Sequence, residues 1–73
     1  MLVKVEAYYD GKFWCGRGVR ADFFTQGKTL DDLLKNVTEA AALHFEDSLR
    51  RGETLNILLM SETQVTLGKA AAG

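Results

Sequence analysis

Apolar and polar residues alternate along residues 2–9, which is the pattern of a strand with one buried face. Val3, Val5, Ala7 and Tyr9 fall on one side of this strand, because successive side chains of a strand point to opposite faces. We therefore expect residues 2–9 to form a strand with this side toward the core.

Asp10-Gly11 follows, and this pair favours a two-residue hairpin turn because the central positions of that turn favour a positive φ. The chain is then expected to return as a second strand over residues 12–17. Such a turn places Ala7 opposite Trp14, so Trp14 is expected to share the buried face. The opposite face is expected to carry three other side chains: Tyr8, Phe13 and Cys15.

The second strand ends in a glycine-rich stretch, Gly16-Arg17-Gly18, which indicates a bulge or a bend. Residues 19–22 are read as a connection. Residues 23–26 then form a short third strand, which Gly27 ends.

A long helix is predicted from Leu30 to about Arg50. Thr29 is a good N-cap, and Asp32 three residues later makes a variant of the capping box. Apolar residues recur at spacings of three and four along the segment, and Gly52 is a natural C-cap.

Residues 55–60 are apolar on both faces and predict a last strand that is either inside the sheet or covered on both faces. Residues 65–67 are predicted to add a short strand, and residues 70–73 are expected to fray. The order of elements predicts an α+β fold of two layers. It has a three-stranded meander, one long helix, and a fourth strand parallel to the first.

The length of 73 residues fits one domain over residues 1–73, with a core over 2–60 and a tail over 61–73. A core this small is marginal, and small domains are usually supported by disulfides, metals or oligomerisation. Cys15 is the single cysteine and His44 the single histidine, which argues against an internal disulfide and a zinc site. We therefore expect no cofactor and a homodimer or larger homo-oligomer.

The charge balance gives no sign of a nucleic-acid or membrane protein. The net charge is -1 and the sequence pI is about 5.7, so the basic surplus of nucleic-acid modules is absent. The first residues alternate apolar and charged positions, and no run approaches the ~18 apolar residues of a membrane span. A cytoplasmic protein is expected.

Catalytic residues are scarce. An enzyme could use Cys15 with His44, but the two lie far apart in sequence, and Cys15 is predicted to share a face with Glu6, which disfavours a thiolate. The adjacent carboxylates Asp31 and Asp32 are explained by the start of the helix, where negative charge is stabilising. We expect a protein that is not an enzyme.

Two surfaces remain as candidate binding sites. An apolar sheet face opposite the helix is usually covered by another chain, and Leu43 lies away from the apolar stripe of the helix. The predicted dimer or partner interface is therefore Tyr8, Phe13, Cys15 and Leu43. The alternative is a single-stranded RNA site on the basic and aromatic segment, made by Lys12, Phe13, Arg17 and Arg20.

The chain resembles the HicB-like antitoxin family over about residues 2–60. The matching segments are Asp10-Gly11, then Thr25 to Leu33, then Asn36, Ala40 and Ala41, and finally Leu49 to Glu53. The resemblance implies a partial ribonuclease-H-like fold without nuclease carboxylates. It also implies a protein that dimerises and binds a small mRNA-cleaving toxin, the HicA-like toxin.

The chain departs from the family pattern in two places. The segment between the second and third strands, Gly18 to Phe23, lacks the prolines that family members often have there. After Met60 there are 13 residues, which is too few for the DNA-binding segment that many members carry. DNA binding is therefore not expected for this chain alone.

Overall fold

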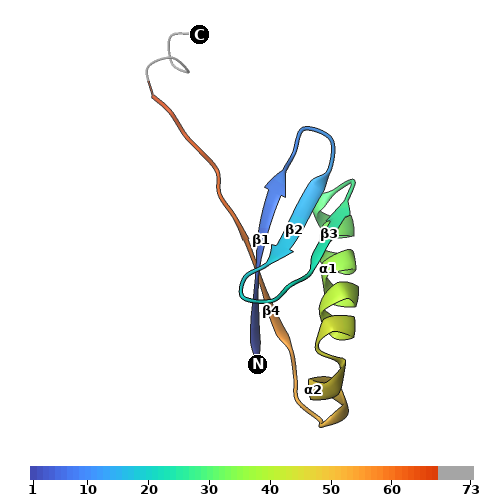
Figure 1. Ribbon diagram of the computed structural model, residues 1–73. Coiled ribbons are helices and arrows are strands. Elements are labelled where there is room, and N and C mark those ends of the chain that lie inside the picture. Colours follow the sequence, from blue (N-terminus) through green and yellow to red (C-terminus); the bar gives the residue numbers. More distant parts are fainter. Residues whose placement is uncertain (68–73) are drawn as a thin grey trace.

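The computed structural model describes residues 1–67, which form one four-stranded sheet with a long helix against one of its faces (Figure 1). The elements along the chain are β1 (Leu2–Tyr9), β2 (Trp14–Gly18), β3 (Phe24–Gly27), α1 (Leu30–His44), α2 (Glu46–Arg50) and β4 (Asn56–Ser61). The longest helix, α1, has 15 residues, and no helix in this part of the chain has the length and apolarity needed to cross a bilayer.

The sheet has the order β3-β2-β1-β4. β1 is antiparallel to β2, β2 is antiparallel to β3, and β4 is parallel to β1. The predicted α+β fold, with a meander, a helix and a last strand parallel to the first, is confirmed. One detail differs: β4 lies at the edge of the sheet rather than inside it. The segment containing α1 and α2 therefore connects two opposite edges.

The core lies between the sheet and α1. Val3, Val5 and Ala7 of β1 pack against Leu33 and Val37 of α1, and all five are buried. Partly buried apolar residues surround this cluster, namely Trp14, Phe23, Phe45, Leu55, Ile57 and Leu59. The predicted inward faces of the first two strands are therefore confirmed.

The hairpin between β1 and β2 differs from the predicted two-residue turn. Tyr9 pairs with Trp14, so the loop has four residues, and only Gly11 within it has a positive φ, of 101°. The loop is held by Asp10, whose Oδ1 accepts hydrogen bonds from the backbone N–H groups of Lys12 (2.8 Å) and Phe13 (2.7 Å). An aspartate that bonds backbone groups two and three residues ahead stabilises this longer loop.

The error shifts the register by two residues, so it does not change the faces. Tyr8 opposes Cys15 instead of Phe13, and Ala7 opposes Gly16 instead of Trp14. Because the side-chain period of a strand is two, an even shift keeps each side chain on its predicted face. Phe13 itself lies in the loop and not in a strand.

The predicted single helix is two helices. Thr29 is the N-cap as expected, and its Oγ1 accepts a hydrogen bond from Asp32 N at 3.1 Å. The helix stops at Phe45, whose φ of −105° and ψ of 32° are not helical and whose side chain packs against the core. Gly52, with a φ of 87°, ends α2 as predicted.

The predicted short strand over residues 65–67 is wrong. After β4 the chain runs away from the sheet as an extended tail (Figure 1), and Val65 and Leu67 are 85% and 87% exposed. No neighbouring strand is there to pair with them among residues 1–67. The predicted fraying of residues 70–73 concerns a segment outside the described residues.

Candidate interaction surface

The face of the sheet opposite α1, which we call the outer face, has no second layer within residues 1–67. The strand register places four large apolar side chains on it, each roughly half exposed. They are Leu2 (57%), Tyr8 (44%), Phe24 (54%) and Leu58 (43%). Exposed apolar groups on one contiguous face are typical of a surface that another molecule covers.

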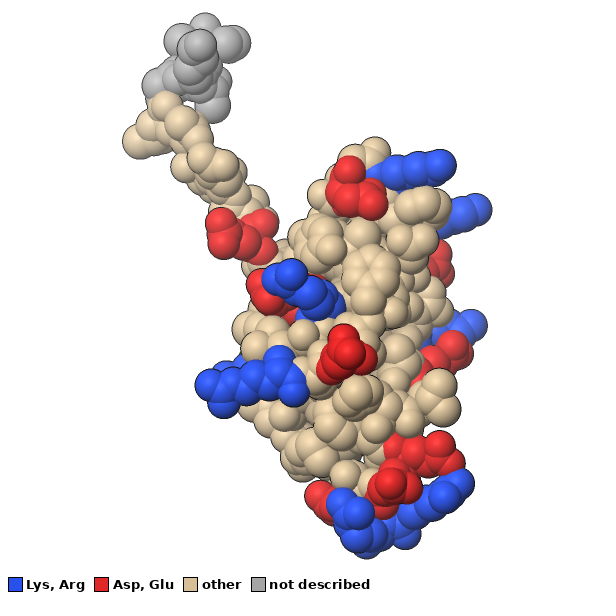
Figure 2. All heavy atoms as spheres, viewed as in Figure 1, with Lys and Arg blue, Asp and Glu red and all other residues tan. Residues whose placement is uncertain are grey.

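The middle of the outer face is polar. Lys4, Glu6 and Arg17 lie there, and Arg17 Nη2 contacts Glu6 Oε1 at 3.0 Å. Exposed pairs of this kind contribute about 0–1 kcal/mol to stability. Figure 2 shows acidic and basic groups interspersed on the visible face of the molecule, without a large patch of one sign. Because Lys4, Glu6 and Arg17 lie between the four apolar side chains, the centre of the outer face is polar.

A shallow hollow of about 690 Å³ lies on the outer face between the ends of β1 and β4. Its wall includes Tyr8, Met60, Glu6 and Glu62. Lys4 lines it as well, and Glu6 is already paired with Arg17, so the hollow is of mixed charge, with Glu62 as its second carboxylate.

The structure separates the four predicted interface residues. Tyr8 lies on the outer face, and Phe13 is half-buried in the adjoining loop. Cys15 is only 2% exposed, so it has almost no surface to offer a partner in the single chain. Its Sγ lies 3.6 Å from Asp10 Oδ2 and 3.8 Å from the carbonyl oxygen of Phe13, because the four-residue loop folds over it. Leu43 is 74% exposed on α1, in the other layer of the fold.

Cys15 is expected to be an unreactive thiol. Burial raises the pKa of Cys15, and the nearby carboxylate of Asp10 raises it further, so the reactive thiolate forms only at higher pH. Alkylation of the native protein by iodoacetamide should therefore follow a pH profile displaced above that of the urea-unfolded chain, and should be slower at every pH below it. Equal rates in the native and unfolded chains would contradict this account.

The same shift has a consequence for stability. A thiol with a raised pKa in the folded state stabilises the fold below its ordinary value, and that contribution is lost as the pH rises through the folded value. The wild-type protein should therefore lose stability relative to Cys15→Ala above about pH 9.

Cys15 and His44 do not form a catalytic pair. The ring of His44 lies against those of Phe23 (5.6 Å between centroids) and Phe45 (4.8 Å), at the C-terminal end of α1. Cys15 lies on the outer face beside the hairpin loop, which is at the other end of the sheet. No group of three or more His, Cys, Asp or Glu side chains within residues 1–67 is placed to hold a metal ion.

The four candidate RNA-binding residues do not line up. Lys12 lies in the hairpin loop, 5.5 Å above the ring of Phe13, whereas Arg20 follows the opposite end of β2. Arg17, between them, is paired with Glu6. A binding site for single-stranded RNA combines a continuous basic groove with stacked aromatic rings, and these residues do not supply that groove.

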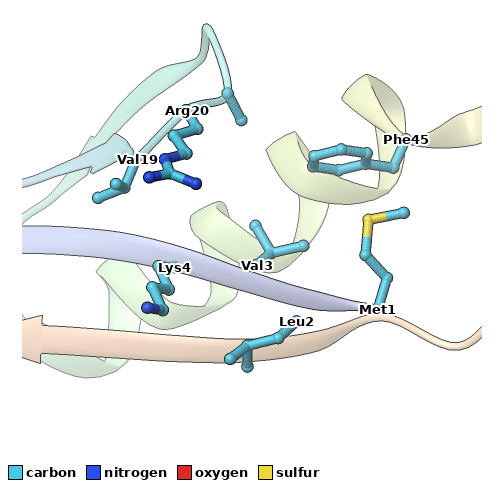
Figure 3. Close-up of a pocket in the computed structure, with 8 residues that line it drawn as sticks. Met1, Leu2, Val3, Lys4, Val19, Arg20 and Phe45 are labelled. Atoms are coloured by element: carbon cyan, nitrogen blue, oxygen red, sulfur yellow. The ribbon is translucent and has the colours of Figure 1, made fainter.

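One open pocket, of about 420 Å³, lies where the β2–β3 connection passes the start of β1 (Figure 3). Met1 points toward Phe45 on one side, and Arg20 extends from the connection toward β1 on the other. Lys4 is the second cation of the lining. Both cations are exposed, and no buried polar side chain lines the pocket, so its lining does not form a defined ligand site.

The sequence carries signals for the outer-face residues that lie outside the predicted interface. Leu2 lies among the polar positions of the first strand, and Leu58 belongs to a run that is apolar on both faces. Phe24 follows Phe23 directly, and in a strand two adjacent aromatic residues point to opposite sides.

Comparison of the chain with models of known protein families, with curated proteins and with solved structures gives no match.

Proposed function

We propose that this protein is a non-catalytic binding module, an antitoxin of the HicB-like kind that neutralises a small mRNA-cleaving toxin through its outer face. The observation that carries the proposal is the open sheet face, which presents Leu2, Tyr8, Phe24 and Leu58 at 43–57% exposure. Large apolar groups placed around a central ion pair give the outer face the mixture of apolar and polar area that protein interfaces contain.

The residues behind the family resemblance support the proposal because they build a scaffold and not an active site. Gly27 lets α1 pack directly on β3, Thr29 caps the helix, and Asn36 Nδ2 donates to the Gln26 carbonyl oxygen at 2.7 Å. None of these contacts involves a side chain of the outer face. The scaffold therefore leaves that face free for a partner.

One carboxylate at the rim of the outer face, Glu62, is suited to a basic group of a partner. An enzyme that cleaves RNA needs cationic residues to bind phosphates. Glu62 lines the hollow beside Tyr8, together with Lys4 and with Glu6, which is paired with Arg17. A lysine or arginine of a toxin placed in this hollow would meet a carboxylate and be removed from RNA binding.

Co-expression with a HicA-like toxin encoded beside this chain tests the proposal. The wild-type chain should relieve the growth arrest and co-purify with the toxin. Phe24→Asp, which places a charge on the outer face, should lose both properties. Leu43→Asp is the matched control, because Leu43 is exposed on α1 in the other layer and its replacement should change neither.

Circular dichroism of both variants establishes that each is folded. Growth arrest that the wild-type chain does not relieve, together with no co-purification, would rule out the antitoxin function. If Phe24→Asp relieved the growth arrest and Leu43→Asp did not, the toxin would bind α1 and not the outer face.

A further inference from the structure

The edge strand β4 has the properties of a strand that pairs with another chain. Its sequence, Asn-Ile-Leu-Leu-Met-Ser, contains no charge and no proline, and its other neighbour in the sheet is absent within residues 1–67. Natural proteins usually protect an open edge with charged residues, prolines or bulges, because an unprotected edge pairs readily. β4 has no such charge or proline along its six residues.

Only every second residue of β4 directs its backbone N–H and C=O groups to β1. Asn56 N donates to the Met1 carbonyl oxygen at 2.8 Å, so Asn56 directs its backbone groups toward β1. In a parallel pair this direction alternates, which leaves Ile57, Leu59 and Ser61 directing theirs away from β1. These N–H and C=O groups form a row that a further strand can bond.

The opposite edge of the sheet is protected by comparison. β3 has four residues, and the side chain of Asn36 already bonds the backbone carbonyl of Gln26. The two edges therefore differ, and the capacity for pairing is concentrated at β4.

Apolar groups flank the β4 edge on both sides of the sheet. On the outer face, Leu58 is 43% exposed, and on the helix side the half-buried Ile57 lines an apolar cleft. A cleft of about 370 Å³ separates α1 from β4, with a mostly apolar lining that includes Ala42, Leu49, Leu55 and Ile57. A chain docked along β4 would cover both sides together.

We propose that β4 pairs antiparallel with β4 of a second copy of this chain, which joins two sheets into one of eight strands. The two-fold axis stands perpendicular to the sheet at Leu58, so both α1 helices lie on the same side. Directly opposed residues then share a face, and the register places Leu58 opposite Leu58, and Ile57 opposite Leu59. The outward groups of Ile57 and Leu59 face each other as a hydrogen-bonded pair.

A second copy fits this edge because the segment is complementary to itself. A two-fold interface requires a surface that matches its own copy. In this register the three central positions meet only apolar residues, and no two like charges oppose each other along β4. A shift to the next register that preserves the faces would instead place Ser61 opposite Ile57.

The tail gains a neighbour in the same arrangement. Glu62 would lie opposite Thr54 of the second copy, and the residues after it would pass the second copy's cleft, which Thr54 and Leu55 help to line. Val65 and Leu67, which are 85% and 87% exposed in the single chain, are thereby brought to an apolar surface.

Light scattering coupled to size exclusion tests the pairing on the full chain. The wild type should show twice the 8.1 kDa mass of one chain. Leu58→Lys should raise the dissociation constant of the dimer at least about tenfold, because it sets two lysines directly opposite each other. Leu2→Lys is the matched control: Leu2 is a leucine of similar exposure on the same face, but it lies on β1, and the dimer should persist.

Hydrogen exchange gives a second measurement that needs no substitution. The amides of Ile57 and Leu59 should be protected at high protein concentration and lose that protection on dilution, while the amide of Leu58 stays protected by β1. A monomer at all concentrations, a dimer that Leu58→Lys leaves intact, or amides of Ile57 and Leu59 that exchange freely within the dimer would each overturn the proposal. None of these results bears on toxin binding by the outer face.

Discussion

Leu33→Ala is expected to lower the free energy of unfolding by about 2–5 kcal/mol, the range for removing a buried leucine side chain. Leu33 is fully buried, and it packs in the cluster with Val3, Val5 and Val37 between the sheet and α1. A chain of 73 residues has a total stability of only about 4–11 kcal/mol. The substitution should therefore remove a large share of the total stability.

Urea denaturation followed by circular dichroism measures the effect, with wild type and variants at one protein concentration so that any association contributes equally. Leu43→Ala is the control, since it removes the same atoms from the same helix at a position that is 74% exposed. It should change the free energy of unfolding by about 0.5 kcal/mol or less. Equal losses for the two variants would mean that Leu33 is not the centre of the core.

The features that the sequence predicted correctly depend on local patterns. The two-residue period of β1 places Val3, Val5 and Ala7 inward whatever lies elsewhere, and the cap at Thr29 needs only the amide of Asp32. The faces of β2 were predicted correctly although the turn was not, because the register differs from the predicted one by two residues. Local physics therefore fixed the elements and their faces even where it did not fix the loop.

The features that were missed depend on tertiary contacts. The helix stops at Phe45 because that residue leaves the helical conformation where its ring packs on the core, and spacing along the helix does not reveal this. Cys15 is covered by a loop whose length was predicted wrongly, so its burial could not be foreseen. The apolar run at Leu58 was read as an inner or doubly covered strand, yet the order of the sheet makes it an edge.

The edge position of β4 changes how its apolar side chains are explained. An inner strand that is apolar on both faces is explained within one molecule, whereas an edge strand with that composition leaves apolar groups uncovered. The half-exposed Leu58 and the open groups of Ile57 and Leu59 follow directly from the position of β4. The outer face and the β4 edge thus meet at Leu58, while Tyr8 and Phe24 lie on the outer face away from that edge.

Gly27→Ala is expected to destabilise the fold by about 1–3 kcal/mol, at the upper end of that range, because the added methyl group meets atoms that cannot rotate away. A Cβ at position 27 would lie 2.6 Å from Leu33 N and 2.9 Å from the carbonyl carbon of Asp32. Both are backbone atoms of the first turn of α1. The whole helix would have to move away from β3, which would also strain the bond from Asn36 to Gln26.

Gly16→Ala is the matched control, because it adds the same methyl group at a second buried glycine of the sheet. Its nearest contacts are the side-chain atoms Val37 Cγ2 at 3.0 Å and Leu33 Cδ1 at 3.2 Å, which can shift by a few tenths of an ångström. The loss of stability in urea should therefore be clearly smaller for Gly16→Ala than for Gly27→Ala. If the order were reversed, the close approach of α1 to β3 would not be what requires glycine in the Thr-Gln-Gly segment. That segment would then have to be explained by something other than the scaffold.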